Sequence, residues 1–577
     1  MLKQLWPYTK GYRQWIAVGV ICSAAEAVFE LLIPLVMADI VDIGIANGDV
    51  NYIAVKGLTM VAMAIISLCF GVGAAFFSSR AGFGLGANLR DAQFAHIQDF
   101  AFENIERFST ASLITRMTSD VNAIQVTLMM GIRLMVRAPV MLVTALVLAI
   151  FISVQLSLSF AVAIPVLVVF IGMMLVRVGP LFKKLQACID GLNLAVQEDV
   201  TNIRVVKSFA QEDYQNAQFD EKNQDLKKAS QTAFGTVITI MPTMMLVIYA
   251  TIIAVLWFGG QMVFAGDLEV GKLTSMFTYV TQILMALMMV SMVSMQATRA
   301  IACAKRVCEV LSETPAISDN GNQDLLVEHG TITFENVSFK YHKDAPNWIL
   351  ENINLTIPAG ATVGVLGATG SAKTTLVSLI PRLYEADSGV VSVGGRPVRD
   401  YTLHNLRNSV AMVLQQNTLF SGTILENLRW GNPEATEEQV LKACESACVD
   451  EFLDRMEDGL NTDLGQGGVN VSGGQKQRLC IARAILKQPK ILILDDSTSA
   501  VDTATDAKIR KAFAEDLGDT TKIIIAQRIS SVMDADLILV MDDGRISAQG
   551  IHGDLMERSE IYRSIYDAQQ KGVDDNG

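Results

Sequence analysis

The sequence predicts a polytopic α-helical membrane domain, of six transmembrane helices with long cytoplasmic extensions, fused to an α/β domain of the P-loop kind. The first observation is composition, since 51% of the 577 residues are hydrophobic and the mean hydropathy is +0.35. The second is a Gly-rich loop between an apolar, strand-like run at residues 362–366 and a helix-like pattern at residues 375–380. The two signals lie in different halves of the chain, which predicts two domains.

Six apolar stretches in the first half are long enough to cross about 30 Å of hydrocarbon at a helical rise of about 1.5 Å per residue. We place them at residues 16–38, 57–79, 134–153, 157–176, 236–258 and 273–295. Basic residues crowd the N-terminus and the two long connections, whereas the opposite loops carry only Lys56 and Lys272. The positive-inside rule therefore predicts that both termini and the long connections are cytoplasmic.

The two long connections are rich in helix formers and contain few prolines. If each forms two helices that run out and back, it projects on the order of 35–40 Å from the membrane. Apolar positions continue through Ile114, Met117 and Val121, which favours helices over a disordered linker.

Composition also divides the rest of the chain. We expect a membrane domain at residues 1–300, a polar linker at 301–330, a nucleotide-binding domain at 331–567 and a polar tail at 568–577. The formal net charge of −13 argues against a nucleic-acid partner. The eight cysteines lack metal-binding spacing, and we interpret them as reduced.

The Gly-rich loop predicts a phosphate site and makes the second domain an α/β P-loop ATPase domain with ATP and Mg²⁺ as cofactors. Backbone N–H groups of such a loop hold the phosphates, together with the N-terminus of the helix that follows. Lys373 supplies positive charge, and the Thr374 hydroxyl binds Mg²⁺. Ala372 replaces the usual glycine, which predicts weaker or reshaped nucleotide binding. The predicted nucleotide-binding residues of the loop are Gly367, Ala368, Thr369, Gly370, Ser371, Ala372, Lys373, Thr374 and Thr375.

Further sequence motifs resemble those of a known protein family. Residues 471–478 resemble the signature sequence of ATP-binding-cassette proteins, and residues 491–495 resemble their Walker B strand. Residues 499–502 are similar to the D-loop, Gln415 to the Q-loop glutamine, and Tyr341 to the aromatic residue that stacks on adenine. The resemblance implies nucleotide-site roles for Tyr341, Gln415, Ser472, Gly473, Gly474, Gln475, Asp495 and Asp502.

The resemblance covers the whole chain and implies an exporter half-transporter. In this family two cassettes dimerise head to tail, so each ATP lies between the phosphate loop of one cassette and the signature of the other. Mg²⁺ is held by the positions of Thr374, Gln415 and Asp495, partly through water. The exporters also have coupling helices at the tips of the two connections, here near residues 102–110 and 205–214.

The phosphate site departs from the family pattern at three positions. The residue after Asp495 is normally a Glu that acts on the attacking water, but here it is Asp496, whose carboxylate is one methylene shorter. A misplacement on the order of 1 Å costs about 10²-fold in rate. Gln527 replaces the switch histidine and cannot carry positive charge. With Ala372, these changes predict a degenerate site, and independent drift in an active ATPase is the alternative.

The signature, by contrast, is intact, which predicts that the chain completes the ATP site of another subunit. We expect a heterodimeric bacterial multidrug-type exporter of the plasma membrane, a translocase whose partner bears the consensus Glu and His and performs most of the catalysis. This chain would bind ATP at a slowly hydrolysing site. The alternatives are a nucleotide-gated regulatory or sensor subunit and a homodimeric exporter.

The substrate is predicted to be an amphiphilic drug or lipid that moves outward by alternating access. Glu26 and Glu30 lie one helical turn apart in the first predicted span. Carboxylates inside a membrane are costly, which makes the pair a candidate for a substrate cavity that attracts cationic amphiphiles. The alternative is a structural pair with Arg133 or Arg137.

Overall fold

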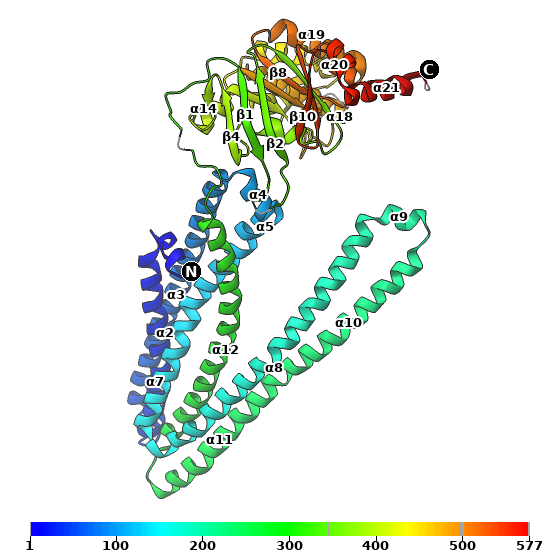
Figure 1. Ribbon diagram of the computed structural model, residues 1–577. Coiled ribbons are helices and arrows are strands. Elements are labelled where there is room, and N and C mark those ends of the chain that lie inside the picture. Colours follow the sequence, from blue (N-terminus) through cyan, green and yellow to red (C-terminus); the bar gives the residue numbers. More distant parts are fainter. Residues whose placement is uncertain (1, 320, 344, 497–500, 575–577) are drawn as a thin grey trace. The chain divides into compact units, whose positions relative to one another are not determined.

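The computed structural model describes residues 2–319, 321–343, 345–496 and 501–574, and it divides into two compact units (Figure 1). The first unit contains Met1–Gln98 and Thr110–Glu313, and the second contains Asp99–Ser109 and Thr314–Gly577. The short segment at residues 99–109 therefore belongs to the C-terminal unit, although the helical unit surrounds it in sequence.

The first unit is helical. Within the described residues, six stretches are long and apolar enough to cross a membrane: Arg13–Ile45, Val50–Gln98, Thr110–Ile152, Val154–Thr201, Glu212–Ala265 and Val270–Val290. Each overlaps one predicted span, and several continue far beyond the membrane thickness. The helices are α1 (Leu2–Leu5), α2 (Arg13–Asp39), α3 (Val50–Gln98), α5 (Thr110–Thr115), α6 (Val121–Met130), α7 (Val136–Ile152), α8 (Val154–Thr201), α9 (Ile203–Ser208), α10 (Glu212–Ile238), α11 (Ile240–Ala265) and α12 (Val270–Ser312).

The core of this unit lies where α2, α7, α8, α11 and α12 meet, around the buried side chains of Leu31, Phe160 and Tyr279. The Tyr279 hydroxyl donates to the Leu31 carbonyl oxygen at 2.9 Å, so its one polar group is satisfied inside this apolar core. This packing joins the first and last spans of the unit.

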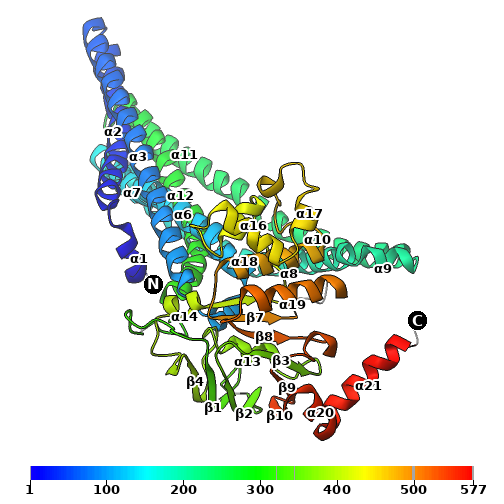
Figure 2. The same ribbon diagram turned by 90° about the horizontal axis from the view of Figure 1, so that it is seen from above.

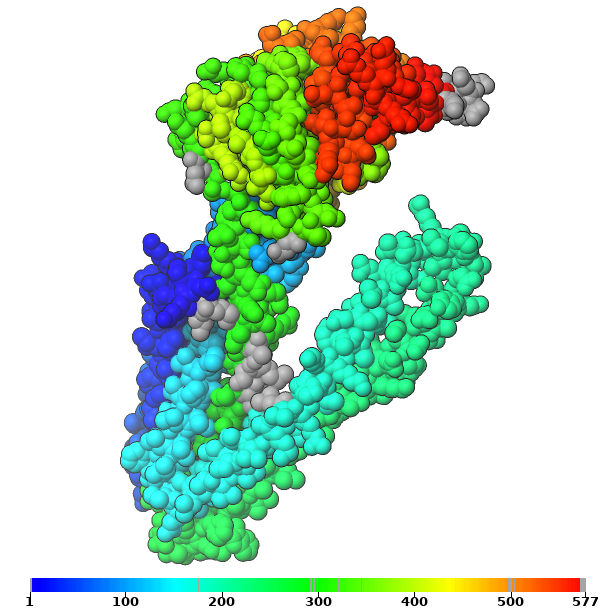
Figure 3. Space-filling view, in the orientation of Figure 1, coloured from blue at the N-terminus to red at the C-terminus, as the bar shows by residue number. Residues whose placement is uncertain are grey.

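Helices α8 to α11 form an arm that diverges from the other helices of the same unit, with α9 at its tip (Figure 1). At this tip Phe209 is 70% exposed and Tyr214 is 59% exposed. The space-filling view shows the outer part of the arm without a covering helix from the rest of its unit (Figure 3). Large aromatic side chains are therefore presented to solvent at one end of the arm.

Two predicted polar segments are partly helical. Helix α12 continues to Ser312, so the first part of the predicted polar linker, residues 301–312, is helical. The reason is that Cys303, Val307 and Cys308 keep an apolar face that packs against Leu89. The expected tail is helical as far as Asp574, because apolar residues such as Ile561 and Ile565 hold that helix on the C-terminal core.

The second unit contains two sheets. The first has the strand order β2-β1-β4-β5 and the second β10-β9-β3-β8-β7-β6; Figure 2 shows β7, β8, β3 and β9 in this order. The strands are β1 (Ile332–Phe339), β2 (Leu350–Ile357), β3 (Thr362–Gly367), β4 (Ser388–Val393), β5 (Arg396–Pro397), β6 (Val410–Val413), β7 (Ile491–Asp495), β8 (Thr521–Ile525), β9 (Leu537–Asp542) and β10 (Arg545–Gly550).

Neighbouring strands from β9 to β6 run parallel, and β10 joins β9 antiparallel. Every residue of β7 and of β8 is buried, as expected for strands covered on both faces. The helices of the unit are α4 (Phe102–Phe108), α13 (Lys373–Ser378), α14 (Leu403–Ser409), α15 (Ile424–Arg429), α16 (Glu437–Ser446), α17 (Asp450–Leu453), α18 (Gly473–Leu486), α19 (Thr503–Asp516), α20 (His552–Arg558) and α21 (Glu560–Asp574).

Candidate nucleotide site

Three neighbouring parallel strands bring the predicted site residues together. Strand β3 ends at Gly367, β7 at Asp495 and β8 at Ile525, and β8 lies between the other two. Their carboxyl ends meet at one edge of the sheet, where α/β folds of this kind bind ligands. The phosphate loop and Asp496 follow these ends directly, and Gln527 lies two residues after the end of β8.

The phosphate loop connects β3 to α13. Gly367 adopts φ +152°, and a Cβ there would lie 2.3 Å from the Met541 carbonyl oxygen, so this position requires glycine. Lys373 Nζ donates to the carbonyl oxygens of Gly367 at 2.9 Å and Ala368 at 2.8 Å. Burial lowers the pKa of Lys373. A phosphate group at this loop would restore the environment that favours the charged ammonium.

Ala372 is strained. It adopts φ +68°, in the left-handed region that alanine enters only at a cost. This explains in physical terms why the motif normally has glycine here.

We expect Ala372→Gly to raise the free energy of unfolding by about 0.5–1 kcal/mol, because glycine removes the strain. The apparent melting temperature of the purified chain should rise, and ATP should bind more tightly. Ala368→Gly is the matched control, since Ala368 lies in the same loop outside the left-handed region and gains nothing from the change. A lower melting temperature for Ala372→Gly than for the wild type would contradict the claim that the Ala372 backbone is strained.

Strand β7 ends at Asp495, and Asp496 follows it directly. Asp495 is buried, and its Oδ2 accepts a hydrogen bond from the Thr374 hydroxyl at 2.8 Å. Burial raises the pKa of both Asp495 and Asp496. Hydroxyl and carboxylate oxygens are ligands that Mg²⁺ accepts while it keeps several waters and binds nucleotide phosphates. Thr374 and Asp495 therefore fit Mg²⁺, and the bound ion would neutralise phosphate charge.

Asp496 contacts both other predicted residues of the water-activating region. Gln527 Nε2 donates to Asp496 Oδ2 at 2.6 Å, and Gln415 Nε2 lies 3.5 Å from the same oxygen. Asp496 adopts φ +49°, a conformation that short Asp tolerates better than longer side chains. Two of the three departures from the family pattern, Asp496 and Gln527, are thus in direct contact with each other.

The signature residues form the exposed start of α18. The Ser472 hydroxyl accepts from the Gln475 backbone N–H at 3.3 Å, and Gln475 Oε1 accepts from the Ser472 N–H at 2.8 Å. This capping box has a structural role. Exposed Ser472 and Gly473 also leave a helix N-terminus open to an anion. A Cβ on Gly473 would meet nothing within 4 Å, so its backbone is approachable.

Only part of the predicted D-loop, residues 499–502, lies within the described residues. Ser499 and Ala500 lie outside the described residues. Asp502 caps α19, because its Oδ1 accepts from the Thr505 backbone N–H at 3.0 Å and its Oδ2 from the Thr505 hydroxyl at 2.7 Å.

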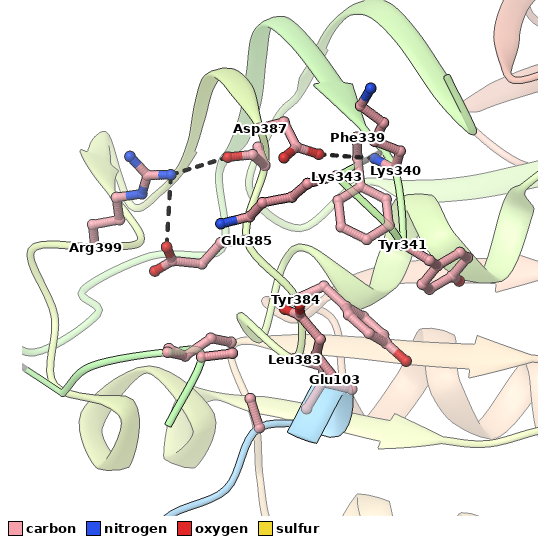
Figure 4. A pocket seen from close by; sticks show the side chains of 14 residues that line it. Glu103, Phe339, Lys340, Tyr341, Lys343, Leu383, Tyr384, Glu385, Asp387 and Arg399 are labelled. Carbon is pink, nitrogen blue, oxygen red and sulfur yellow. Dashed lines mark hydrogen bonds and ion pairs between the residues drawn. The ribbon is translucent and has the colours of Figure 1, made fainter. Parts of the chain in front are cut away.

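Tyr341 lies beside the phosphate loop and a cavity of about 230 Å³ (Figure 4). Its hydroxyl is 2.9 Å from the Thr375 hydroxyl, and its ring meets that of Tyr384 edge-on, with centroids 5.1 Å apart. Tyr384 in turn donates from its hydroxyl to Glu106 Oε1 of α4 at 2.8 Å. Tyr384 therefore links the predicted adenine-binding residue to the helix at residues 102–108, through a ring contact on one side and a hydrogen bond on the other.

Sequence reasoning missed two residues that support the site. One is Tyr384, which belongs to no motif. The other is Gln569 of α21, whose Nε2 donates to the Gln527 carbonyl oxygen at 2.8 Å and whose Oε1 accepts from the Ile529 N–H at 2.9 Å. The helical spacing of Ile561 and Ile565 was the available signal that this segment is not a free tail. Gln569 thus holds the backbone at Gln527 and at Ile529.

The membrane candidates form a separate cluster. Arg137 of α7, and not Arg133, pairs with the two carboxylates: its Nη1 lies 2.5 Å from Glu26 Oε1, and its Nη2 forms an ion pair with Glu30 Oε2.

Comparisons with known proteins agree with this architecture. Residues 16–287 match the ABC transporter transmembrane region, and residues 350–499 match the family described as ABC transporter. An uncharacterized ABC transporter ATP-binding protein of Mycobacterium tuberculosis (strain CDC 1551 / Oshkosh) is 36% identical over 575 residues, which cover 99% of this chain and 98% of that protein. YfiB of Bacillus subtilis (strain 168), described in the same words, is 35% identical over 563 residues, 97% of each chain.

A solved structure shares the fold. A bacterial Atm1-family ABC exporter with ATP bound superposes with a TM-score of 0.80 at 24% sequence identity, covering 96% of this chain and 98% of that chain. The chain therefore belongs to the ATP-binding-cassette transporter family, and it joins one membrane region to one ATPase region in the fold of an exporter half-transporter.

Proposed function

We propose that this chain is the degenerate-site subunit of a heterodimeric ATP-driven exporter. It binds ATP and Mg²⁺ at a slowly hydrolysing site and supplies an intact signature to the catalytic site of a partner that bears the consensus Glu and His. The observation that carries the proposal is the contact between Asp496 and Gln527 beside an undamaged, exposed signature.

The chemistry of Asp496 supports slow hydrolysis. A general base must reach the proton it accepts within about 2.6–3.2 Å. The Asp496 carboxylate is one methylene shorter than that of Glu, and its Oδ2 already accepts from the Gln527 amide. The same amide is neutral, whereas a histidine at this position can carry positive charge toward a γ-phosphate. The phosphate loop can thus hold ATP while activation of the water is poor.

Two surfaces of the chain support a second subunit. One is the exposed aromatic tip of the α8–α11 arm, with Phe209 and Tyr214. The other is a groove of about 310 Å³ on the second unit, lined in part by Leu414, Phe420 and Trp430. The Phe420 and Trp430 rings stack with centroids 4.1 Å apart, and each side chain is exposed. We propose that the tip of each subunit docks on such a groove of the other.

The membrane region supports export by alternating access. With both termini on the cytoplasmic side of a bacterial plasma membrane, the segments at residues 102–110 and 205–214 act as coupling helices; the first contains α4 and the second overlaps α9. The substrate is an amphiphilic small molecule or lipid. A regulatory or sensor subunit has no need of six spans that carry a buried ion cluster, and a homodimer would contain two sites with the Asp496–Gln527 pair.

The test is the ATPase activity of the purified chain, first alone and then with the half-transporter encoded beside its gene. We expect negligible activity alone and strong activity together, because only the partner's site combines a Glu with a complete signature. Robust activity of the chain alone would instead mean that Asp496 and Gln527 suffice in a homodimer.

A further inference from the structure

Three ionisable side chains from two helices meet in the membrane-spanning part of the chain. Glu26 and Glu30 lie on α2, and Arg137 lies at the start of α7. The Arg137 guanidinium pairs with both carboxylates. We call these three residues the Glu-Arg-Glu triad. Two carboxylates and one guanidinium give it a net formal charge of −1.

The excess negative charge lies on carboxylate groups whose oxygens are not all hydrogen-bonded within the described residues. Glu26 is only 8% exposed, and its Oε2 has no hydrogen-bond partner among the described residues. On α3, Gly71 makes room for this carboxylate, since a Cβ there would lie 2.9 Å from Glu26 Oε1. A buried carboxylate oxygen without a partner is costly unless something else offsets its charge.

The triad is also partly exposed, and within the described ranges no cation other than Arg137 forms an ion pair with it. The Glu30 side chain is about one-third exposed, at 33%. Arg133, one turn before Arg137, is exposed, and its guanidinium forms no ion pair or hydrogen bond with any described residue. By contrast, the ion pair of Lys56 and Asp39 at the end of α2, 2.7 Å apart, joins one positive and one negative side chain.

We propose that the Glu-Arg-Glu triad binds the single positive charge of a lipophilic cation carried by the transporter, of the ammonium or phosphonium class. The inference rests on the proposed export function and adds the charge of the substrate to it. Attraction between opposite charges is strong where water is scarce, so one excess charge in the membrane region selects strongly by sign. A cation whose charge is spread over apolar groups offsets the negative charge of the carboxylates by attraction alone and needs no hydrogen-bond donor.

The experiment measures equilibrium binding of tetraphenylphosphonium to the full chain in lipid nanodiscs, with and without the partner subunit and with empty nanodiscs as background. Tetraphenylborate serves as the probe of equal shape and opposite charge. We expect the chain to bind the phosphonium specifically and not the borate. Glu30→Gln and, independently, Glu26→Gln bring the triad to zero charge and should weaken phosphonium binding by roughly tenfold or more.

The double variant Glu30→Gln with Arg137→Gln provides the decisive comparison. It breaks the ion pairs altogether but returns the net charge to −1, so phosphonium binding should recover. A structural role predicts the reverse, a further loss. Asp39→Asn is the matched control, because it neutralises a carboxylate on the same helix outside the triad, and binding should stay at the wild-type level.

Unchanged phosphonium binding in both single Gln variants would overturn the proposal, as would equal affinity for the borate. Size-exclusion elution and ATP binding confirm that each variant is folded. Phosphonium binding is measured without ATP hydrolysis or transport. The proposed export function is tested separately, and it fails if neither neutral nor charged probes are transported. If only the proposal about the Glu-Arg-Glu triad is wrong, neutral probes should still be transported.

Discussion

Ser472→Ala in this chain is expected to lower the ATPase rate of the assembled transporter by about 10²–10³-fold, the usual effect of removing one donor from a charge-stabilising site. In the proposed heterodimer the Ser472 hydroxyl and the α18 N-terminus face the ATP held by the partner, so a change here acts on a reaction in the other subunit. The measurement is steady-state ATP hydrolysis by the reconstituted pair.

The control must separate this effect from the capping role of Ser472. Thr436 caps α16 with the same box, in which its hydroxyl accepts from the Gln439 N–H at 3.3 Å. Thr436→Ala should cost similar cap stability, about 1 kcal/mol, and leave hydrolysis nearly unchanged. Ser472→Thr keeps both hydroxyl and cap and should remain active. Equal losses in Ser472→Ala and Thr436→Ala would mean that Ser472 is only a cap.

Asp496→Glu combined with Gln527→His is expected to raise the ATPase rate at this chain's own site by about 10²-fold, because it restores the reach of the carboxylate and the charge of the switch residue. Glutamate tolerates the backbone at φ +49° less well than aspartate, so a small loss of thermal stability should accompany the gain. The rate is measured with a partner whose own Glu is replaced by Gln.

Each single variant tests how far the two residues depend on each other. Gln527 donates directly to Asp496, so the effects of the two changes should not be additive. A double variant no faster than the wild type would contradict the proposal that these residues slow the site. Slow hydrolysis at this site would then need another cause, such as Ala372.

The sequence was most informative where chemistry demands fixed spacing. The phosphate loop, the two aspartates and Gln527 were predictable, because each follows an apolar strand and parallel strands align such ends. The contact between Asp496 and Gln527 was not, since it depends on β7 and β8 being neighbours in the sheet. Composition can suggest a pair of carboxylates in a membrane, but it cannot choose between Arg133 and Arg137, which differ by one turn of helix.

Composition was a poor guide to the ends of helices. Residues 301–312 read as polar, yet the spacing of Val307 and Cys308 keeps α12 helical to Ser312. In the same way, Gln569 lies in a polar stretch and still contacts the backbone next to Gln527. Such contacts come from packing between distant parts of the chain, which local polarity does not encode.

The position of α4 has a consequence for biosynthesis. Glu106 bonds to Tyr384, which lies 278 residues later in the chain. At a synthesis rate of about 5–20 residues per second, the segment at residues 102–108 waits tens of seconds for its docking surface to be made. During this interval Phe102 lacks the Tyr384 ring that it meets in the folded chain, where the ring centroids lie 6.0 Å apart. Assembly of this protein is therefore vulnerable late in translation, at a segment made early.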